Sequence, residues 1–244
     1  MMRVWDNELL ISRGAKVVED GLLSWTDFRD VITVASSNQY GYATGTITDR
    51  VTGELLPIKA RNNVENIYFT QENGFLCLYT QTGLSREKAI IPASPITGIK
   101  AIEFIYADET DASATTEWWQ AMFASTVQSL YVRGECRVTS LGKVFRDPLI
   151  GTAQPAHYFV QINDGYLEMF MNGQRMLMAS VSATAFATSN NNGLFLVNRK
   201  RGSNETPPTP PLRVGFIRLY NRPLSRDELA QNIQYETEAG RLIL

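Results

Sequence analysis

Apolar and polar residues alternate with a period of two along most of the chain, a pattern typical of β-strands. The clearest example is residues 157–181, where three alternating runs are separated by Asn163-Asp164-Gly165 and by Asn172-Gly173. Asp-Gly and Asn-Gly supply the positive φ angles that tight type I′ turns require. This stretch therefore predicts a three-stranded meander. Its strands are expected near residues 158–162, 166–171 and 174–178.

Other runs rich in β-branched and aromatic residues predict further strands. Residues 65–70 and 74–80 flank a Gln-Glu-Asn-Gly turn signal and are expected to form a hairpin. Residues 98–107 form a long β-rich run whose charges are Lys100 and Glu103. Additional strands are expected near residues 22–28, 118–124, 130–133, 136–139, 194–198 and 213–220.

Three segments are expected to connect strands. Residues 41–45 contain two glycines without the Lys-Ser/Thr of a phosphate loop, so they predict a turn. The run Arg199-Lys-Arg-Gly202 predicts a hairpin tip, either as a solvated turn or as a contact for an anion or a glycan acid. The four prolines within residues 207–211 predict extended polyproline II in a loop.

One helix is expected, close to the C-terminal end. Ser225 and Glu228 have the spacing of a capping box, in which the serine hydroxyl accepts from the third backbone N–H while the glutamate reaches back. Pro223 precedes this signal, and apolar residues at helical spacing follow it. The pattern predicts a short amphipathic helix over about residues 225–237 that ends near Gly240.

Many short strands followed by one terminal helix predict an all-β protein. The 244 residues fit one unit, because β-sandwiches often reach roughly 200–250 residues without dividing. No internal repeat or linker separates the chain into parts. We therefore expect residues 17–244 to form a single domain, and residues 1–16 to be an N-terminal arm or an extra strand.

Composition narrows the classes of protein. An apolar share of 44% and a charged share of 20% exclude a disordered chain, and a net charge of −2 does not favour nucleic acid or anionic lipid as partners. No run approaches the roughly 18 apolar residues of a membrane helix, and charges interrupt the opening residues where a signal peptide needs an apolar run. Cys77 and Cys136 are expected to be reduced core thiols, with a single disulfide as the alternative.

The closing segment carries a family resemblance. Residues 214–229 (VGFIRLYNRPLSRDEL) resemble the last strand and capped helix of concanavalin A-like, laminin-G-like jelly-roll domains. Residues 166–173 are similar to the Asn-Gly hairpin of that family, and residues 21–28 to its opening strand. Residues 49–53 stand where many members have an Asp-x-Ser-Gly-Asn turn, but they lack its Gly-Asn pattern. The resemblance implies a jelly-roll sandwich of two antiparallel sheets with a short C-terminal helix.

The same family includes lectins and also glycosidases, so the resemblance leaves function open. Its glycosidases carry carboxylates on one strand as Glu-x-Asp-x-x-Glu, a spacing that Glu103, Asp108 and Glu109 do not match. The chain has no Gly-x-Ser-x-Gly elbow, which would carry the serine nucleophile of a triad with His157. His157 is therefore expected to be a structural histidine. We therefore expect no catalytic centre.

Sugar binding needs aromatic faces together with carboxylates or carboxamides. Asp108 and Asp111 shortly before Trp118-Trp119 make the best candidate cluster, and Asn191 lies in a second polar segment. Adjacent tryptophans on a strand point to opposite faces, so one is expected in the core and the other at the surface or an interface. Calcium is an optional cofactor, for which the candidate ligands are Asp108, Glu109 and Asp111.

These features predict a non-catalytic binding or assembly module on an exterior surface. The resemblance suggests a virion protein of a tailed phage, in a fibre, a tail or a capsid decoration, made in the cytoplasm. Its expected partners are a cell-surface glycan or other virion proteins, in a homo-oligomer or a larger assembly. Two alternatives stay open: a polysaccharide-acting glycoside hydrolase on the same fold, and a non-viral bacterial glycan-binding module.

Overall fold

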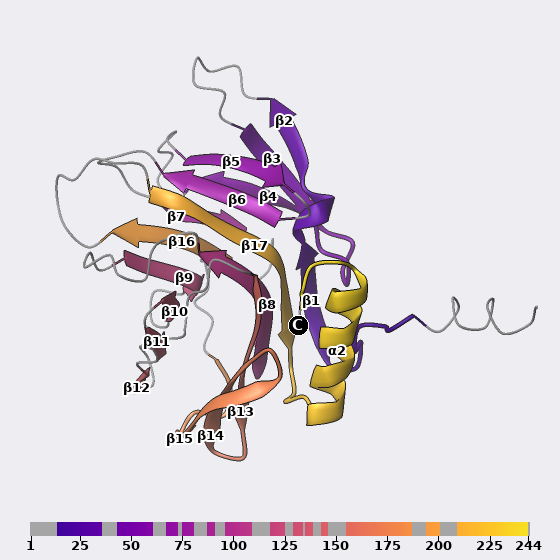
Figure 1. Cartoon of the computed structure of the whole chain (residues 1–244), viewed down its shortest axis with the longest axis vertical. Coiled ribbons are helices and arrows are strands. Elements are labelled where there is room, and N and C mark those ends of the chain that lie inside the picture. The colour runs from indigo at the N-terminus through magenta and orange to yellow at the C-terminus, as the bar shows by residue number, and fades with distance from the viewer. Residues whose placement is uncertain are drawn as a thin grey trace, which may run out of the picture.

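The computed structural model describes residues 14–35, 43–60, 67–72, 75–80, 87–90, 96–108, 118–124, 129–133, 135–138, 143–145, 155–186, 194–200 and 209–243. In this part of the chain two antiparallel sheets and one C-terminal helix make up the fold (Figure 1). The structure confirms the prediction of an all-β sandwich that ends in a helix.

The first sheet has eight described strands, in the order β15-β14-β13-β8-β17-β6-β5, with β1 also paired to β17. The long strand β17 lies at its centre: β8 pairs along one side, and β6 and β1 share the other. The strands are β1 (Leu22–Asp27), β5 (Ile67–Glu72), β6 (Phe75–Thr80), β8 (Ala101–Asp108), β13 (Ala156–Asn163), β14 (Tyr166–Met171), β15 (Gln174–Ser180) and β17 (Thr209–Tyr220).

The second sheet has nine described strands, in the order β12-β11-β10-β9-β16-β7-β4-β3-β2. Its strands are β2 (Ile32–Ala35), β3 (Ala43–Thr48), β4 (Leu55–Ala60), β7 (Glu87–Ile90), β9 (Trp118–Ala124), β10 (Ser129–Arg133), β11 (Glu135–Val138), β12 (Lys143–Phe145) and β16 (Leu194–Lys200). A short 3₁₀ helix, η1 (Phe28–Asp30), follows β1.

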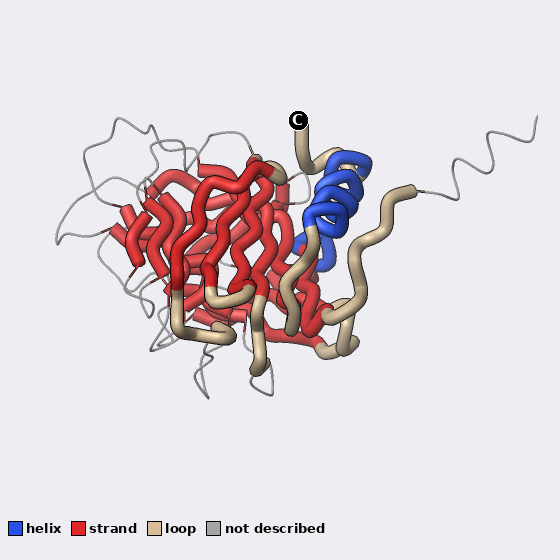
Figure 2. The backbone as a smooth tube through the Cα atoms, turned by 90° about the horizontal axis from the view of Figure 1, so that it is seen from below, coloured by secondary structure: helices blue, strands red, loops and turns tan. Residues whose placement is uncertain are grey.

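Helix α2 (Arg226–Glu238) forms a third layer on the face of the eight-stranded sheet that points away from the second sheet. Figure 1 shows the helix alongside β1 and β17, on the other side from β9 and β16, and Figure 2 shows it (blue) to one side of the strands (red). The chain before β1 runs along α2, where the N–H of Ala15 donates to Glu238 and the N–H of Val18 donates to Asn232. Val18 belongs to the same core as Ile105 and Phe159 of the sheet, so the N-terminal segment packs beside the helix.

Alternation along the central strands creates two cores. In β8, Ile102, Phe104 and Tyr106 belong to the core between the sheets, which also contains Ile47 of the second sheet. Ala101 and Ile105 alternate with them and belong to a second core, under α2. Strand β8 is buried on both faces for this reason, and its polar residue Glu103 lies on the helix side.

The local turn and cap predictions are confirmed. Strands β13, β14 and β15 form the expected meander, with positive φ at Asp164 (47°) and Asn172 (49°) and at the glycine after each. The Ser225–Glu228 capping box is present in both directions, with the serine as N-cap of α2. Gly240 follows the helix with φ of 72°. Short polar signals of this kind act over a few residues, so the sequence suffices to locate them.

Three expected connections are wrong where the structure describes them. Residues 43–45 are the start of β3 rather than a turn, since Gly45 pairs with Ile58 of β4. Arg199 and Lys200 pair with β9 and are not a hairpin tip. Pro210 and Pro211 lie inside β17, where the ladder with β6 shifts register between Thr209 and Leu212. Because proline has no N–H to donate, it fits a strand at such an irregularity.

Candidate functional site

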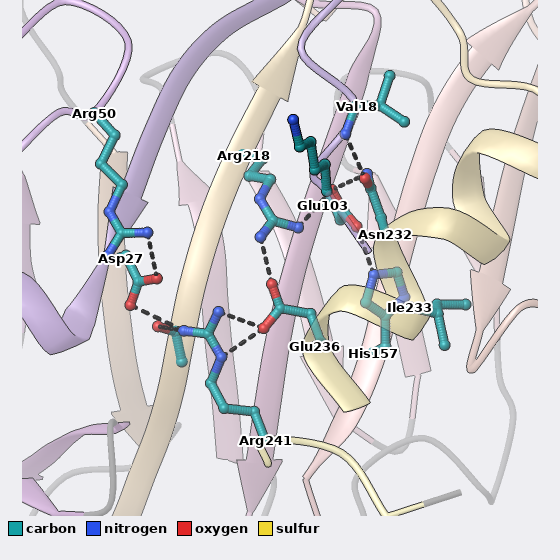
Figure 3. Close-up of polar contacts among 12 residues, drawn as sticks. Val18, Asp27, Arg50, Glu103, His157, Arg218, Asn232, Ile233, Glu236 and Arg241 are labelled. Carbon is teal, nitrogen blue, oxygen red and sulfur yellow. Dashed lines mark hydrogen bonds and ion pairs between the residues drawn. The ribbon is translucent and has the colours of Figure 1, made fainter. Parts of the chain in front are cut away.

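A buried polar layer lies between helix α2 and the eight-stranded sheet (Figure 3). Its strand residues are Glu103 of β8, His157 of β13 and Arg218 of β17, all on the sheet face that α2 covers. Glu103 pairs directly with Arg218 in one ladder, and His157 lies on the strand at the other side of β8. The alternation that buries apolar side chains elsewhere therefore brings three ionisable groups together here.

Glu103 is the centre of this layer. One carboxylate oxygen lies 2.6 Å from Nε2 of His157, and the other accepts from Arg218 at 3.3 Å. That second oxygen also accepts from the Tyr220 hydroxyl at 3.1 Å and from Nδ2 of Asn232 on α2 at 2.9 Å. His157 is fully buried, so the structure places it inside the protein and away from any open groove.

The layer continues to the end of the helix. Glu236 of α2 accepts from Arg218 and also pairs with Arg241, which follows the helix. Arg241 donates in turn to Asp27 at the end of β1, over 2.9 Å. Arg50 approaches the other oxygen of Asp27 at 3.2 Å. These ion pairs fasten α2 to β17 and β1.

The charges explain why these carboxylates stay ionised. Burial by itself raises the pKa of Glu103, but the Arg218 charge and the contacts with His157 and Tyr220 outweigh it and hold the pKa below its ordinary value. The same balance lowers the pKa of Asp27, where contacts from Arg29, Arg241 and Arg50 overcome the effect of burial. Glu103 and Asp27 are therefore buried carboxylates whose charge neighbouring arginines offset.

An open cleft of about 180 Å³ lies beside this layer, between the meander and the start of α2. Two buried aromatic residues border it, Phe159 and Phe170, whose ring centroids are 6.0 Å apart. Polar groups and two leucines make up the remaining wall. Those lining residues are Gln161, Asn163, Glu168, Leu224, Ser225, Arg226 and Leu229.

Two polar residues of this cleft are held in fixed positions. Gln161 of β13 and Glu168 of β14 are direct ladder partners, and the amide of Gln161 donates to Glu168 over 2.8 Å. The Gln161 carbonyl accepts the N–H of Leu224 at 2.9 Å, and Arg175 donates to Glu168 from the far side at 3.2 Å. Because both residues are largely buried and their side chains are hydrogen-bonded, the cleft has a preorganised carboxylate and carboxamide.

The residues predicted as a ligand cluster are only partly within the described structure. Asp108 is the last residue of β8, and Trp118 and Trp119 begin β9. The ladder places Trp118 opposite Lys200 and Trp119 opposite Arg199, both from β16. Glu109, Asp111 and Asn191 lie outside the described residues. Trp118 and Trp119 are thus backbone ladder partners of Lys200 and Arg199, which lie far from them in the sequence.

The two cysteines lie in different sheets. Cys77 lies in β6 of the first sheet and Cys136 in β11 of the second. Within the described residues, no three His, Cys, Asp or Glu side chains gather as a metal site. No helix in the described part of the chain combines the length and apolarity needed to cross a membrane.

The fold is similar to solved structures of low sequence identity. One is the binding domain of Paraclostridial Mosquitocidal Protein 1, with a TM-score of 0.54, 10% identity, and coverage of 88% of this chain and 52% of that chain. Another is Trypanosoma rangeli sialidase bound to a difluoro-KDN, with a TM-score of 0.51 and 13% identity over 91% of this chain and 34% of the enzyme. The same sialidase with sialic acid gives a TM-score of 0.50 at 13% identity, over 93% of this chain and 35% of the enzyme.

These likenesses establish a shared β-sandwich fold. This chain spans about half the length of the mosquitocidal binding domain and about a third of the sialidase. No protein-family model matches the chain, and no curated protein sequence matches it either.

Sequence reasoning missed the cleft. Gln161 and Glu168 each lie in an otherwise largely apolar strand, on the face opposite to that of the sheet–sheet core. A lone polar residue at such a position is a signal, since a buried polar group needs a partner. The partner, however, is on the next strand and on the segment leading to α2, which the local pattern does not reveal.

Proposed function

We propose that this protein is a non-catalytic glycan-binding module that holds a sugar in the cleft between β13, β14 and the start of α2. The observation that carries the proposal is the cleft's mixed lining, with the fixed carboxylate of Glu168, the carboxamides of Gln161 and Asn163, and aromatic side chains. A pyranose ring has hydroxyl groups that pair with carboxylates and carboxamides. The volume of about 180 Å³ suits one sugar ring, with the remaining glycan outside.

The ionic character of the cleft supports binding rather than hydrolysis. A glycosidase requires two carboxyl groups about 5–10 Å apart across the bond to be cleaved. Among the described lining residues of the cleft, the carboxylate is that of Glu168, and Gln161 and Arg175 already hold it. Glu103 is sealed beneath α2. The fold likeness to a toxin binding domain supports a binding role, while the likeness to a sialidase supports glycans as the ligand class.

The module is further proposed to act in repeated copies on an exterior surface. A single-ring cleft gives weak affinity, so repeated copies on an exterior surface would supply the strength that one copy lacks. A tailed-phage virion is such a surface, and the family resemblance of residues 214–229 supports it. Sedimentation of the purified protein tests the assembly part: a homo-oligomer is expected, and a monomer at high concentration contradicts it.

A glycan array with the wild-type protein tests the binding function directly. Glu168→Gln keeps the side-chain shape and removes the charge, and we expect it to lower retention on the array about tenfold or more, as for a lost charge-assisted hydrogen bond. Glu19→Gln is the matched control, since Glu19 is exposed and lies outside the cleft. Equal melting temperatures show that the fold is intact.

Two results would overturn this function. One is a wild-type protein that no glycan on the array retains. The other is release of reducing sugar from a retained glycan by the wild-type protein, which would make the module an enzyme. If Glu168→Gln does not change retention on the array, the glycan binds at a place other than this cleft.

A further inference from the structure

We infer that the ligand of the cleft is an oligosaccharide whose second ring lies on Tyr166 and Met178, on the open part of the meander. The inference rests on the proposed glycan-binding function and adds to it a minimum ligand length and a second contact. Both side chains are exposed. Neither residue is part of the cleft lining.

Strand alternation puts Tyr166 on the same face of β14 as the cleft residue Glu168. Leu167 and Met169 belong to the core between the sheets. Because side chains alternate along a strand, Tyr166, Glu168 and Phe170 lie on the opposite face. Phe170 belongs to the second core, under α2, so this opposite face is the one that the helix covers.

Ladder partners extend this face to the neighbouring strands. Asn163 of β13, which lines the cleft, is the direct partner of Tyr166. Met178 of β15 is the direct partner of Glu168, and the adjacent Leu177 packs against the core between the sheets. Tyr166 and Met178 are therefore diagonal neighbours, roughly 7–8 Å apart, a distance that aromatic and long side chains bridge.

Helix α2 covers only one part of this face. Along β14 the relative exposure rises from 4% at Phe170 through 8% at Glu168 to 41% at Tyr166. Along β13, Gln161 is buried and Asn163 is half-buried. The face therefore emerges from beneath the start of α2 at the cleft and is open toward the turn that joins β13 to β14.

Tyr166 and Met178 supply an accessible apolar surface beside the polar groups of the cleft. The aromatic residues that border the cleft, Phe159 and Phe170, are buried. An exposed aromatic ring combines a large apolar area with a face of partial negative charge. The C–H groups on one side of a sugar ring are polarised by neighbouring oxygen atoms, so they pack on such a face. The unbranched thioether of Met178 adapts its shape to the ligand beside it.

The size of the cleft determines the minimum length of the ligand. A volume of about 180 Å³ suits one ring, so a longer glycan has to continue outside it. Tyr166 is two residues from Glu168, which is roughly 7 Å along the strand. This separation is comparable with one sugar ring and its glycosidic linkage. Two linked rings therefore reach from Glu168 to Tyr166.

The test uses an array of homo-oligomers of glucose, galactose, mannose, N-acetylglucosamine and N-acetylneuraminic acid, each with one to four rings. Retention of the wild-type protein should increase about tenfold from one ring to two, as apolar surface of Tyr166 is buried. We expect Tyr166→Ala to remove this increase and to leave single-ring binding, measured by competition with the free monosaccharide, unchanged. Tyr166→Phe should keep the increase because it keeps the aromatic ring, and Met178→Ala should lose part of it.

The controls address folding and the place of the contact. Leu55→Ala also shortens an exposed apolar side chain, but in the second sheet, and should not change the increase. Tyr166→Thr removes the ring and keeps a residue that favours strands, so it replaces Tyr166→Ala if that variant melts below the wild type. Glu168→Gln should lower retention at every chain length by the same factor, because its contact is with the first ring.

The outcomes separate this inference from the proposed function. If retention does not depend on chain length, or if the increase survives Tyr166→Ala, the second contact is wrong and the cleft alone binds. If none of these oligomers is retained, the inference fails, while retention of any other glycan keeps the proposed function. An oligomer that Tyr166→Ala dissociates without loss of the increase would make this surface a contact between copies of the chain.

Discussion

Glu103 and Arg218 are direct ladder partners in the middle of a sheet, and both side chains are fully buried. Their contact of 3.3 Å is the point from which the polar layer beneath α2 extends, to His157 on one side and to Glu236 on the other. A buried ion pair contributes little net stability compared with apolar residues, but it strongly disfavours any arrangement that leaves one charge alone. We infer that this layer sets where α2 lies on the sheet.

The first prediction concerns the loss of one partner. Arg218→Met keeps much of the side-chain volume but removes the positive charge that the buried carboxylates of Glu103 and Glu236 share. We expect the free energy of unfolding to fall by about 3–5 kcal/mol, as measured by urea denaturation. The double variant Arg218→Met with Glu236→Gln should recover part of the loss. A decrease below about 1 kcal/mol in the single variant would contradict the role given to this pair.

The second prediction concerns acid. Asp27 and Glu103 have pKa values below their ordinary ones in the folded protein, so the unfolded chain takes up protons more readily. The stability they contribute is complete above the ordinary carboxylate pKa of about 4 and is lost as pH falls through the lowered values. Melting temperature should therefore be nearly flat from about pH 5 to 7 and fall steeply below about pH 4.

Added salt is the control for the acid experiment. Buried pairs are screened much less than exposed ones, so about 0.5 M sodium chloride should leave the acid midpoint in place. The emission of Trp25 reports on the region, since the guanidinium of Arg218 lies 4.6 Å from the centre of its ring. A midpoint that moves strongly with salt would assign the acid sensitivity to surface charges instead.

The third prediction compares two glycines with nearly the same backbone. Gly21 has φ of 75° and Gly53 has φ of 73°, so alanine at either position costs about 1–2 kcal/mol of backbone strain. A Cβ at Gly53 would meet nothing within 4 Å, whereas at Gly21 it would lie 2.8 Å from Arg222 and from Asn221. Gly21→Ala should therefore cost about 1–3 kcal/mol more in unfolding free energy than Gly53→Ala. Equal losses would mean that Arg222 moves aside freely.

The fourth prediction concerns the start of α2. Ser225→Ala removes the hydroxyl that accepts the N–H of Glu228 and should reduce the unfolding free energy by about 1 kcal/mol. Hydrogen bonds from Arg222 lower the pKa of Glu228 to about 2. The Glu228 carboxylate, which accepts the N–H of Ser225 in the capping box, therefore stays charged at neutral pH. Ser225→Asp preserves the cap and should be nearly neutral in thermal unfolding. Loss of stability in both variants would indicate that the cleft wall, and not the cap, depends on the serine.

Much of the fold follows from local patterns. Asp164-Gly165 and Asn172-Gly173 predict the meander, since only a few residues tolerate positive φ, and the capping box predicts the start of α2. The alternating runs also predict an all-β protein. Strand β3, however, is short and rich in threonine, alanine and glycine, so its strand character comes from ladder partners on both sides.

The site depends on relationships that no local pattern contains. The sequence by itself determined that Glu103 and Glu168 interrupt largely apolar strands, that Trp118 and Trp119 open another strand, and that a capped helix closes the chain. Tertiary structure decided that Glu103 is neutralised under the helix while Glu168 faces a cleft. It also made Trp119 and Arg199 partners in one strand ladder, contrary to the hairpin tip that the basic run predicts. The physical reason is that the alternation of side chains along a strand determines which face each residue occupies. Strand order and register determine which residues become its neighbours, and they depend on contacts between segments far apart in the chain.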